Sequence, residues 1–204
     1  MLPEKQLAAA LGKIAGVPMH GPFSRAVALQ WVFPKPAPAP RVKAQPLWGM
    51  GSKLYGGRYT PKNSFETVYV AKDMVTALTE VTAIVTGHAG PPFTLVTGPW
   101  VVVAIHGTLS SVLDLTVPAT VHALGSNYQE LTGAWRYIPG QIGEPPTHLL
   151  GRVCHKSKRF DGICFPSSKN PPHGVCVAVF SDRLKAPAFL EVYDPNGNLA
   201  QRLP

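Results

Sequence analysis

The chain has 204 residues, enough for one well-buried domain and too few for two full-sized domains to be expected. Apolar residues make up 45% of it and charged residues 15%, which excludes an intrinsically disordered protein, while 22 prolines and 19 glycines indicate many turns. The net charge of +8 favours an anionic partner, whether a nucleotide, a nucleic acid or an acidic protein, and does not choose among them.

The cysteines and the apolar runs restrict the class of protein further. Cys154, Cys164 and Cys176 include no close pair, which argues against a disulfide framework and against a paired-cysteine zinc site. The first 16 residues lack the apolar core of a signal peptide, and the longest apolar run, residues 100–105, is too short to span a membrane. We therefore expect a protein of the reducing cytoplasm with no membrane partner.

The N-terminal part of the chain, residues 1–47, is predicted to be an accessory segment. Residues 3–14 are typical of a short helix and residues 24–32 of a strand. The alternating prolines that follow must be extended, because each fixes its own φ and disfavours the α conformation of the residue before it. We interpret residues 34–47 as a stiff connector and residues 48–204 as the main domain.

The main domain mixes strands and helices. After a loop over residues 49–61, residues 67–71 predict a strand and residues 74–86 a helix, with Asp73 as its N-cap and Gly87 past its end. The remaining elements expected are strands over residues 100–106, 162–165, 175–180, 189–193 and 199–203, and helices over 118–135 and 147–158. A strong turn sequence joins the last two strands into a hairpin. This mixture predicts an α+β fold with a largely antiparallel sheet.

Two charged residues are candidates for ligand chemistry. Arg58 follows two glycines, which let the backbone come close to a ligand, and a planar guanidinium can hold two phosphate oxygens. Glu80 falls at the edge of an apolar helical stripe, where a carboxylate can face a cleft. A surface arginine and a solvated glutamate are nevertheless the commoner interpretations, and Tyr59 and Tyr69 are by the same measure core residues rather than stacking surfaces.

The common nucleotide-binding motifs do not fit the loop around Arg58. The spacing of Gly51 and Gly56 resembles a phosphate loop, but the required lysine followed by serine or threonine is missing. The third glycine of a dinucleotide-binding fold is missing as well. The basic run over residues 155–159 lies at a predicted helix end, where cations offset the helix dipole. A nucleic-acid-binding module is the weaker alternative, because the lysines are scattered and form no concentrated basic stripe.

Five short motifs, in their order and spacing, resemble the RES domain family. They are Gly56-Gly57-Arg58-Tyr59 with Pro61, Val68-Tyr69-Val70-Ala71, Ala77-Leu78-Thr79-Glu80-Val81, Leu113-Asp114-Leu115-Thr116 and Asp161-Gly162-Ile163-Cys164-Phe165-Pro166-Ser167-Ser168. The family is named for an arginine, a glutamate and a serine, which correspond to Arg58, Glu80 and Ser167. Ser168 is the alternative serine, because Ser168-Lys169 stands where relatives usually have a small residue and an arginine.

The resemblance implies an ADP-ribosyltransferase-like fold, with a split central sheet and surrounding helices, and a toxin that consumes NAD. It implies no metal and no cofactor beyond NAD as the substrate. Such toxins are commonly neutralised by an Xre-type antitoxin, so the expected partner is an antitoxin or an immunity protein, and a homodimer is a further option. The cytoplasm is the expected location, with delivery into a target cell without a classical signal peptide as the alternative.

The resemblance also suggests a mechanism. Cleavage of the nicotinamide–ribose bond leaves an oxocarbenium-like sugar, which calls for a carboxylate near the ribose, here Glu80, and a grip on the pyrophosphate, here Arg58. Ligand positioning is assigned to Tyr59 and Tyr69 at the nicotinamide half, Lys62 at the phosphates, and Ser167 or Ser168 at the ribose or amide. Capture of the sugar by water, phosphate or a protein side chain would give NAD hydrolysis, phosphorolysis or ADP-ribosylation. A secreted antibacterial NADase effector is a further alternative.

Overall fold

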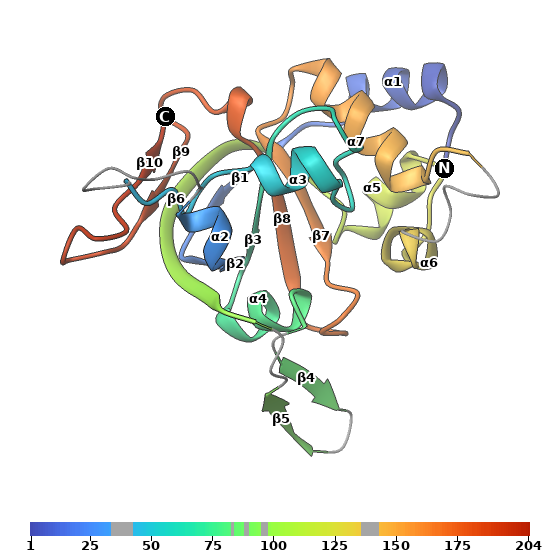
Figure 1. Ribbon diagram of the computed structural model, residues 1–204. Coiled ribbons are helices and arrows are strands. Elements are labelled where there is room, and N and C mark those ends of the chain that lie inside the picture. The colour runs from blue at the N-terminus through green and yellow to red at the C-terminus, as the bar shows by residue number, and fades with distance from the viewer. Residues whose placement is uncertain (34–42, 83, 88–89, 95–97, 136–142) are drawn as a thin grey trace.

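The computed structural model describes residues 1–33, 43–82, 84–87, 90–94, 98–135 and 143–204 (Figure 1). The strands of the main sheet are β1 (Val17–His20), β2 (Phe23–Ala28), β3 (Thr67–Ala71), β6 (Trp100–Asp114), β7 (Gly162–Pro166), β8 (Val175–Phe180), β9 (Phe189–Val192) and β10 (Arg202–Leu203). The helices are α1 (Glu4–Lys13), α2 (Leu29–Val32), α3 (Met50–Tyr55), α4 (Met74–Glu80), α5 (Pro118–Ala123), α6 (Tyr128–Thr132) and α7 (Pro146–Ser157), with a 3-10 turn, η2 (Ser181–Arg183). The strands β4 (Ile84–Gly87) and β5 (Gly90–Thr94) form a separate ribbon that stands away from the sheet beyond α4 (Figure 1).

The main sheet is largely antiparallel and closes on itself through β6. Among the described residues it has eight strands in the order β10–β9–β6–β2–β3–β8–β7, with β1 also paired to β6. The first half of β6 pairs with β2, and its last residues run parallel to β7. This strand of 15 residues serves both neighbours because it curves around the sheet, as Figure 1 shows. The pairings confirm the predicted α+β fold with largely antiparallel strands.

Alternate residues of β8 face two hydrophobic cores, one on each side of the sheet. Cys176, Ala178 and Phe180 belong to the core that contains residues of α1 and α7, whereas Val177 and Val179 belong to the other core. A strand that is buried on both faces needs apolar residues at every position. Residues 175–180 meet this requirement, and the predicted strand is confirmed.

The N-terminal segment contributes to both the sheet and a core. Helix α1 confirms the helix predicted over residues 3–14, and its Leu7 and Leu11 are fully buried in the core shared with α7. Strand β2 lies between β6 and β3 in the sheet. The division of the chain at residue 47 stays a prediction, and residues 34–42 of the expected connector lie outside the described residues.

The strand predicted over residues 24–32 is shorter than expected. Strand β2 ends at Ala28, and the single helical turn α2 follows it. That turn brings the fully buried Val32 into a small core with Val27 and Ala44. Burial of Val32 through a helical turn therefore overrides the strand preference of the local sequence.

The helix predicted over residues 74–86 is also too long. Asp73 caps its start as predicted, since the carboxylate accepts a hydrogen bond of 2.8 Å from the Thr76 backbone N–H, but α4 ends at Glu80. Thr82 has a φ of 58°, which breaks the helix, and residues 84–87 form β4. The β-branched residues that follow Glu80 favour strand over helix, which explains the error.

Smaller differences concern other element boundaries. The loop predicted over residues 49–61 contains the helix α3, and the strand predicted over residues 100–106 continues to Asp114. The helical region expected over residues 118–135 is divided into α5 and α6 near Gly125, whose φ of 60° suits glycine. The last strand is confined to Arg202–Leu203.

Candidate active site

A cavity of about 780 Å³ is lined by residues of β2, β3 and α4 and of the turn that follows α3. A cavity of this size is in the range that holds a small molecule or a cofactor. Four of the residues predicted for the site line it, namely Arg58, Tyr69, Glu80 and Ser168. The tertiary structure thus brings together side chains that are far apart in the sequence.

Arg58 lies at the tip of a tight turn that depends on two glycines. Gly57 and Thr60 exchange backbone hydrogen bonds of 2.9 and 3.1 Å across the turn. Gly56 has a φ of 81°, a conformation that glycine adopts without strain. A Cβ atom on Gly57 would lie 2.5 Å from the hydroxyl oxygen of Tyr69, so glycine allows the turn to lie directly against that ring. The two glycines therefore determine where Arg58 projects.

Helix α7 supports this turn. His148 Nε2 lies 2.9 Å from the Gly57 carbonyl oxygen, a geometry in which the neutral ring donates a hydrogen bond, and burial lowers the pKa of His148. One turn further along α7, a Cβ atom on Gly151 would lie 1.8 Å from the Tyr59 carbonyl oxygen. Helix and turn therefore pack backbone against backbone, and the position of α7 sets the position of Arg58.

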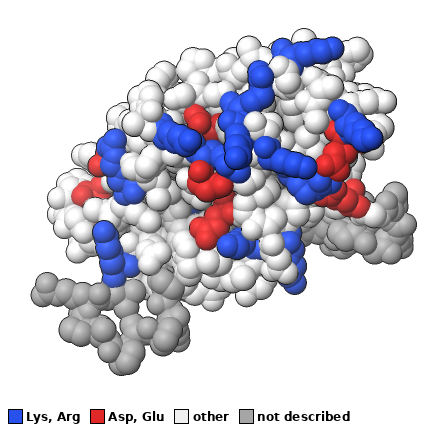
Figure 2. Space-filling model, turned by 90° about the horizontal axis from the view of Figure 1, so that it is seen from above, with Lys and Arg blue, Asp and Glu red and all other residues white. Residues whose placement is uncertain are grey.

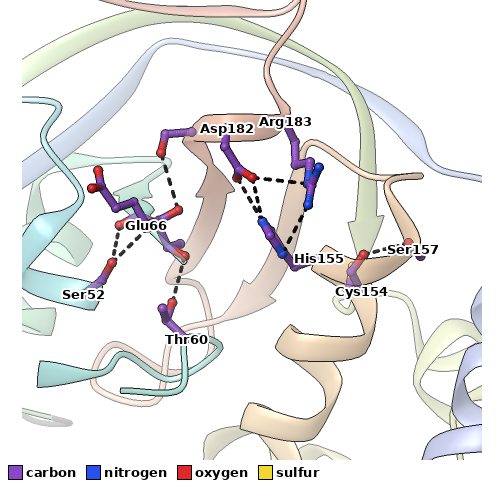
Figure 3. A network of polar contacts seen from close by, with 10 residues as sticks. Ser52, Thr60, Glu66, Cys154, His155, Ser157, Asp182 and Arg183 are labelled. Carbon is purple, nitrogen blue, oxygen red and sulfur yellow. Dashed lines mark hydrogen bonds and ion pairs between the residues drawn. The ribbon is translucent and has the colours of Figure 1, made fainter. Parts of the chain in front are cut away.

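The C-terminal end of α7 is held by a second group of contacts (Figure 3). His155 Nε2 lies 2.9 and 3.0 Å from the two carboxylate oxygens of Asp182 in η2. The imidazole stacks on Phe65, with 3.9 Å between ring centroids. Arg183 adjoins the same pair, with Nη2 3.5 Å from His155 Nδ1. Burial lowers the pKa of His155, and the hydrogen bond to Asp182 opposes that shift. These contacts tie α7 to the end of β8.

The guanidinium of Arg58 is fixed by three hydrogen bonds. Nη1 donates to the carbonyl oxygens of Leu131 at 2.8 Å and Gly133 at 2.9 Å, both at the C-terminal end of α6. Nη2 donates to the Ser168 hydroxyl at 2.9 Å. Carbonyl oxygens at a helix C-terminus carry partial negative charge, which suits a cation. Arg58 is therefore oriented by the protein itself, with part of its surface on the cavity wall.

The carboxylate of Glu80 is held by the loop that follows β7. The Ser167 hydroxyl donates to Glu80 Oε1 at 2.5 Å and accepts hydrogen bonds from the backbone N–H groups of Lys169 and Asn170 at 3.2 and 3.0 Å. Lys169 Nζ donates to the Glu80 carbonyl oxygen at 2.8 Å. Because Ser167 is only 1% exposed and does not line the cavity, it acts on Glu80 rather than on the cavity directly.

The two tyrosines lie in different places. Tyr69 lines the cavity, and its hydroxyl oxygen lies 2.9 Å from both the Tyr59 backbone nitrogen and Thr60 Oγ1. The Tyr59 side chain is fully buried, 4.7 Å from Phe165 between ring centroids, and burial raises its pKa. Lys62 is exposed and is not among the residues that line the cavity. Tyr59 and Lys62 therefore lie off the cavity wall, and Tyr59 supports the turn through its backbone and its packing.

A model of the RES domain family matches residues 34–200 of the sequence. The chain belongs to the RES domain family. Among solved structures it is similar to one described as "Crystal structure of the M.tuberculosis MbcT-MbcA toxin-antitoxin complex", with a TM-score of 0.66 and 18% sequence identity over 93% of this chain and 90% of that chain. At this identity the likeness concerns the fold. No curated protein matches the sequence.

In this RES domain the two adjacent serines have different partners. Ser167 donates to Glu80, and Ser168 accepts from Arg58. The buried serine therefore fixes the carboxylate, and the serine on the cavity wall fixes the guanidinium. A single short loop after β7 couples the two charged groups.

The residues of the cavity wall that sequence reasoning missed include four large side chains, those of Arg25, Trp31, Trp100 and Trp135. Trp135 packs near His148, with 4.9 Å between ring centroids. No local pattern distinguishes these residues from ordinary strand or loop residues. They reach the cavity because of strand pairing and helix packing, which only the tertiary structure reveals.

The surface charge of the RES domain is mixed where Figure 2 shows it, with Asp and Glu side chains among the Lys and Arg side chains. Among the ion pairs of the described residues, Arg152 contacts Glu4 at 2.9 Å and Glu144 at 2.7 Å. The cysteines are buried and form no disulfide. Within the described ranges no helix is long and apolar enough to cross a membrane, and no group of three or more His, Cys, Asp or Glu residues is placed to hold a metal ion.

Proposed function

We propose that this RES domain chain is a toxin that cleaves the nicotinamide–ribose bond of NAD. The observation that carries the proposal is a cavity lined by a guanidinium, Arg58, and a carboxylate, Glu80, both fixed by the loop after β7. An anionic dinucleotide needs the first group, and a positively charged transition state needs the second. Membership of the RES domain family and the shared fold with the toxin-antitoxin structure support the toxin role.

In the proposed reaction the bond between ribose C1′ and the nicotinamide nitrogen breaks, and its electron pair leaves with the nicotinamide. The sugar that remains is an oxocarbenium-like cation, which Glu80 stabilises. Water then adds its oxygen to C1′ and releases a proton, giving ADP-ribose. Arg58 holds the pyrophosphate, so that the ribose stays beside the carboxylate while the bond breaks.

The surrounding residues have supporting roles in this proposal. Ser167 donates a hydrogen bond to Glu80 Oε1, which holds the carboxylate in one orientation. Ser168 keeps Arg58 turned toward the cavity. Tyr69 offers the planar ring on the wall against which the nicotinamide half packs. No step requires a metal or a cofactor other than the substrate.

A direct assay tests the reaction. Purified protein is incubated with NAD, and nicotinamide release is measured for the wild type, Glu80→Gln and Arg58→Ala. Removing a charge that stabilises the transition state costs about a hundredfold in rate, so Glu80→Gln is expected to release nicotinamide at about 1% of the wild-type rate. Glu66→Gln is the matched control, because Glu66 does not line the cavity. Equal release from the wild type and Glu80→Gln would refute the proposed role.

The second candidate reaction is transfer of ADP-ribose to a protein. The same cavity and the same cation serve it, and only the acceptor differs. Incubation with radiolabelled NAD and a cell extract separates the two reactions, since hydrolysis leaves the label in free ADP-ribose and transfer leaves it on protein. Phosphate-dependent release of ADP-ribose 1″-phosphate would identify phosphorolysis instead.

The partner that the proposal implies is an antitoxin that covers the cavity. The shared fold with a toxin-antitoxin structure supports it, and so does the positive charge of Arg58 and Lys169 at the cavity wall, which would attract an acidic segment. Nicotinamide release is therefore expected to stop at saturating partner. Unchanged NAD turnover in the saturated complex would contradict this mode of inhibition.

A further inference from the structure

The cavity extends along strand β2. Every residue from Ser24 to Ala28 lines it. From the first to the last of these five residues a strand extends about 13 Å. Ser24 lies opposite Ala71 of β3, which in turn lies opposite Cys176 of β8. Glu80 accepts a hydrogen bond from Ser167, and the neighbouring Pro166 pairs with Val175, the residue before Cys176, so the carboxylate lies near this end of the cavity. The Ala28 end is accordingly the end remote from the carboxylate.

The remote end of the cavity is lined by aromatic rings. Trp100 is the strand partner of Ala28, Trp31 follows in α2, and both line the cavity. Trp31 is held in place by edge contacts with Trp48 and Tyr55, at 6.0 and 5.9 Å between ring centroids. A fixed aromatic ring on a cavity wall is suited to stacking on a nucleobase.

Arg25 lies between the two ends of the cavity, on β2. Nη2 donates to the Trp48 carbonyl oxygen at 2.9 Å, whereas Nη1 is shielded from solvent and has no hydrogen-bond partner among the described residues. Burial lowers the pKa of Arg25 to about 10, so the guanidinium still carries its charge at neutral pH. No carboxylate of the described residues forms an ion pair with it. Its uncompensated field therefore favours an anion in the cavity.

From these three features we propose that the wall formed by β2 and α2 is a second subsite, which binds the purine nucleotide half of a dinucleotide. Trp31 and Trp100 stack on the base, and the charge of Arg25 attracts the adjoining phosphate. The inference rests on the proposed function, since it places the cleaved half of NAD at Arg58 and Glu80. Its consequence is selectivity for the dinucleotide over nicotinamide mononucleotide, which carries the same scissile bond and lacks the purine half.

Kinetics with the two substrates test the selectivity. Trp31→Leu is expected to lower kcat/KM for NAD by about tenfold, the effect of losing one base stack, and to leave kcat/KM for nicotinamide mononucleotide within about twofold of the wild type. Arg25→Met is expected to raise KM for NAD, and Arg25→Lys to restore most of the loss. Tyr193→Leu is the control, since Tyr193 is 72% exposed and lies off the cavity wall. An equal loss on both substrates, or no loss on NAD, would overturn the inference.

Binding of adenosine monophosphate separates the subsite from the cleavage reaction. Calorimetry with the full chain is expected to show binding to the wild type, unchanged binding to Glu80→Gln, and about tenfold weaker binding to Trp31→Leu. No binding to the wild type would overturn the subsite, whatever the outcome of the cleavage assay. Binding by a protein that leaves NAD intact would support the subsite and refute the proposed function.

Discussion

Replacing Gly151 of α7 with alanine tests whether the Arg58 turn depends on contact with that helix. An added Cβ atom would lie 1.8 Å from the Tyr59 carbonyl oxygen and 2.6 Å from its carbonyl carbon. Both are backbone atoms, so the clash is relieved only if the helix or the turn moves. Gly12 of α1 is the matched control, because it also lies in a helix but is exposed, whereas Gly151 is buried. A Cβ atom on Gly12 meets nothing within 4 Å.

The expected magnitude combines two effects. Glycine to alanine in a helix stabilises by about 1 kcal/mol at either position. Overpacking at Gly151 costs about 1–3 kcal/mol and more where backbone must shift. Gly12→Ala is therefore expected to raise the free energy of unfolding by about 1 kcal/mol, and Gly151→Ala, where backbone must shift, to lower it by about 2 kcal/mol or more. For a chain of this size each kcal/mol corresponds to about 2–4 °C in Tm.

Urea unfolding followed by circular dichroism measures the two free energies, and nicotinamide release measures the site. Gly151→Ala is expected to lose activity at temperatures where it remains folded, because Arg58 adjoins Tyr59 in the displaced turn. Gly12→Ala is expected to keep wild-type activity. If Gly151→Ala proves as stable and as active as Gly12→Ala, the turn is not held by α7 and the reasoning is wrong.

Three further predictions concern stability and reactivity. Burial lowers the pKa values of His148 and His155, so the unfolded chain binds more protons than the folded chain below about pH 6.5. The contribution of these two groups to the free energy of unfolding is therefore expected to be constant above about pH 6.5 and to fall as the pH decreases below it. Urea titrations check this, and a flat profile between about pH 5 and 7 would contradict it. Burial raises the pKa of Cys164 to about 12, so iodoacetamide at pH 8 is expected to leave that thiol unmodified in the native protein and to modify it in urea, as mass spectrometry shows. Asp73→Ala removes the cap on Thr76 and is expected to lower the free energy of unfolding by about 1 kcal/mol in urea titrations, and an unchanged midpoint would show that the cap contributes nothing.

Much of the fold was predictable because the signals are local. The uninterrupted apolar run of β8 reflects burial on both faces, and Asp73 bonds a backbone N–H only three residues away. One error arose where distant packing decided the outcome, since burial of Val32 turned the end of a predicted strand into α2. The other had a local cause, because the left-handed conformation of Thr82 and the β-branched residues around it ended α4 at Glu80.

The sequence by itself determined the local components of the candidate site, namely a glycine turn that presents Arg58, a helix that carries Glu80 and a serine pair after β7. These depend on backbone conformation and on neighbours a few residues away. Only the tertiary structure decided that Ser167 meets the carboxylate and Ser168 the guanidinium, and that Tyr59 points into the core. It also decided that the N-terminal strand β2 forms part of the cavity wall, because β2 lies between β3 and β6 in the sheet. Pairing between strands that are distant in the sequence leaves no local pattern from which it could be predicted.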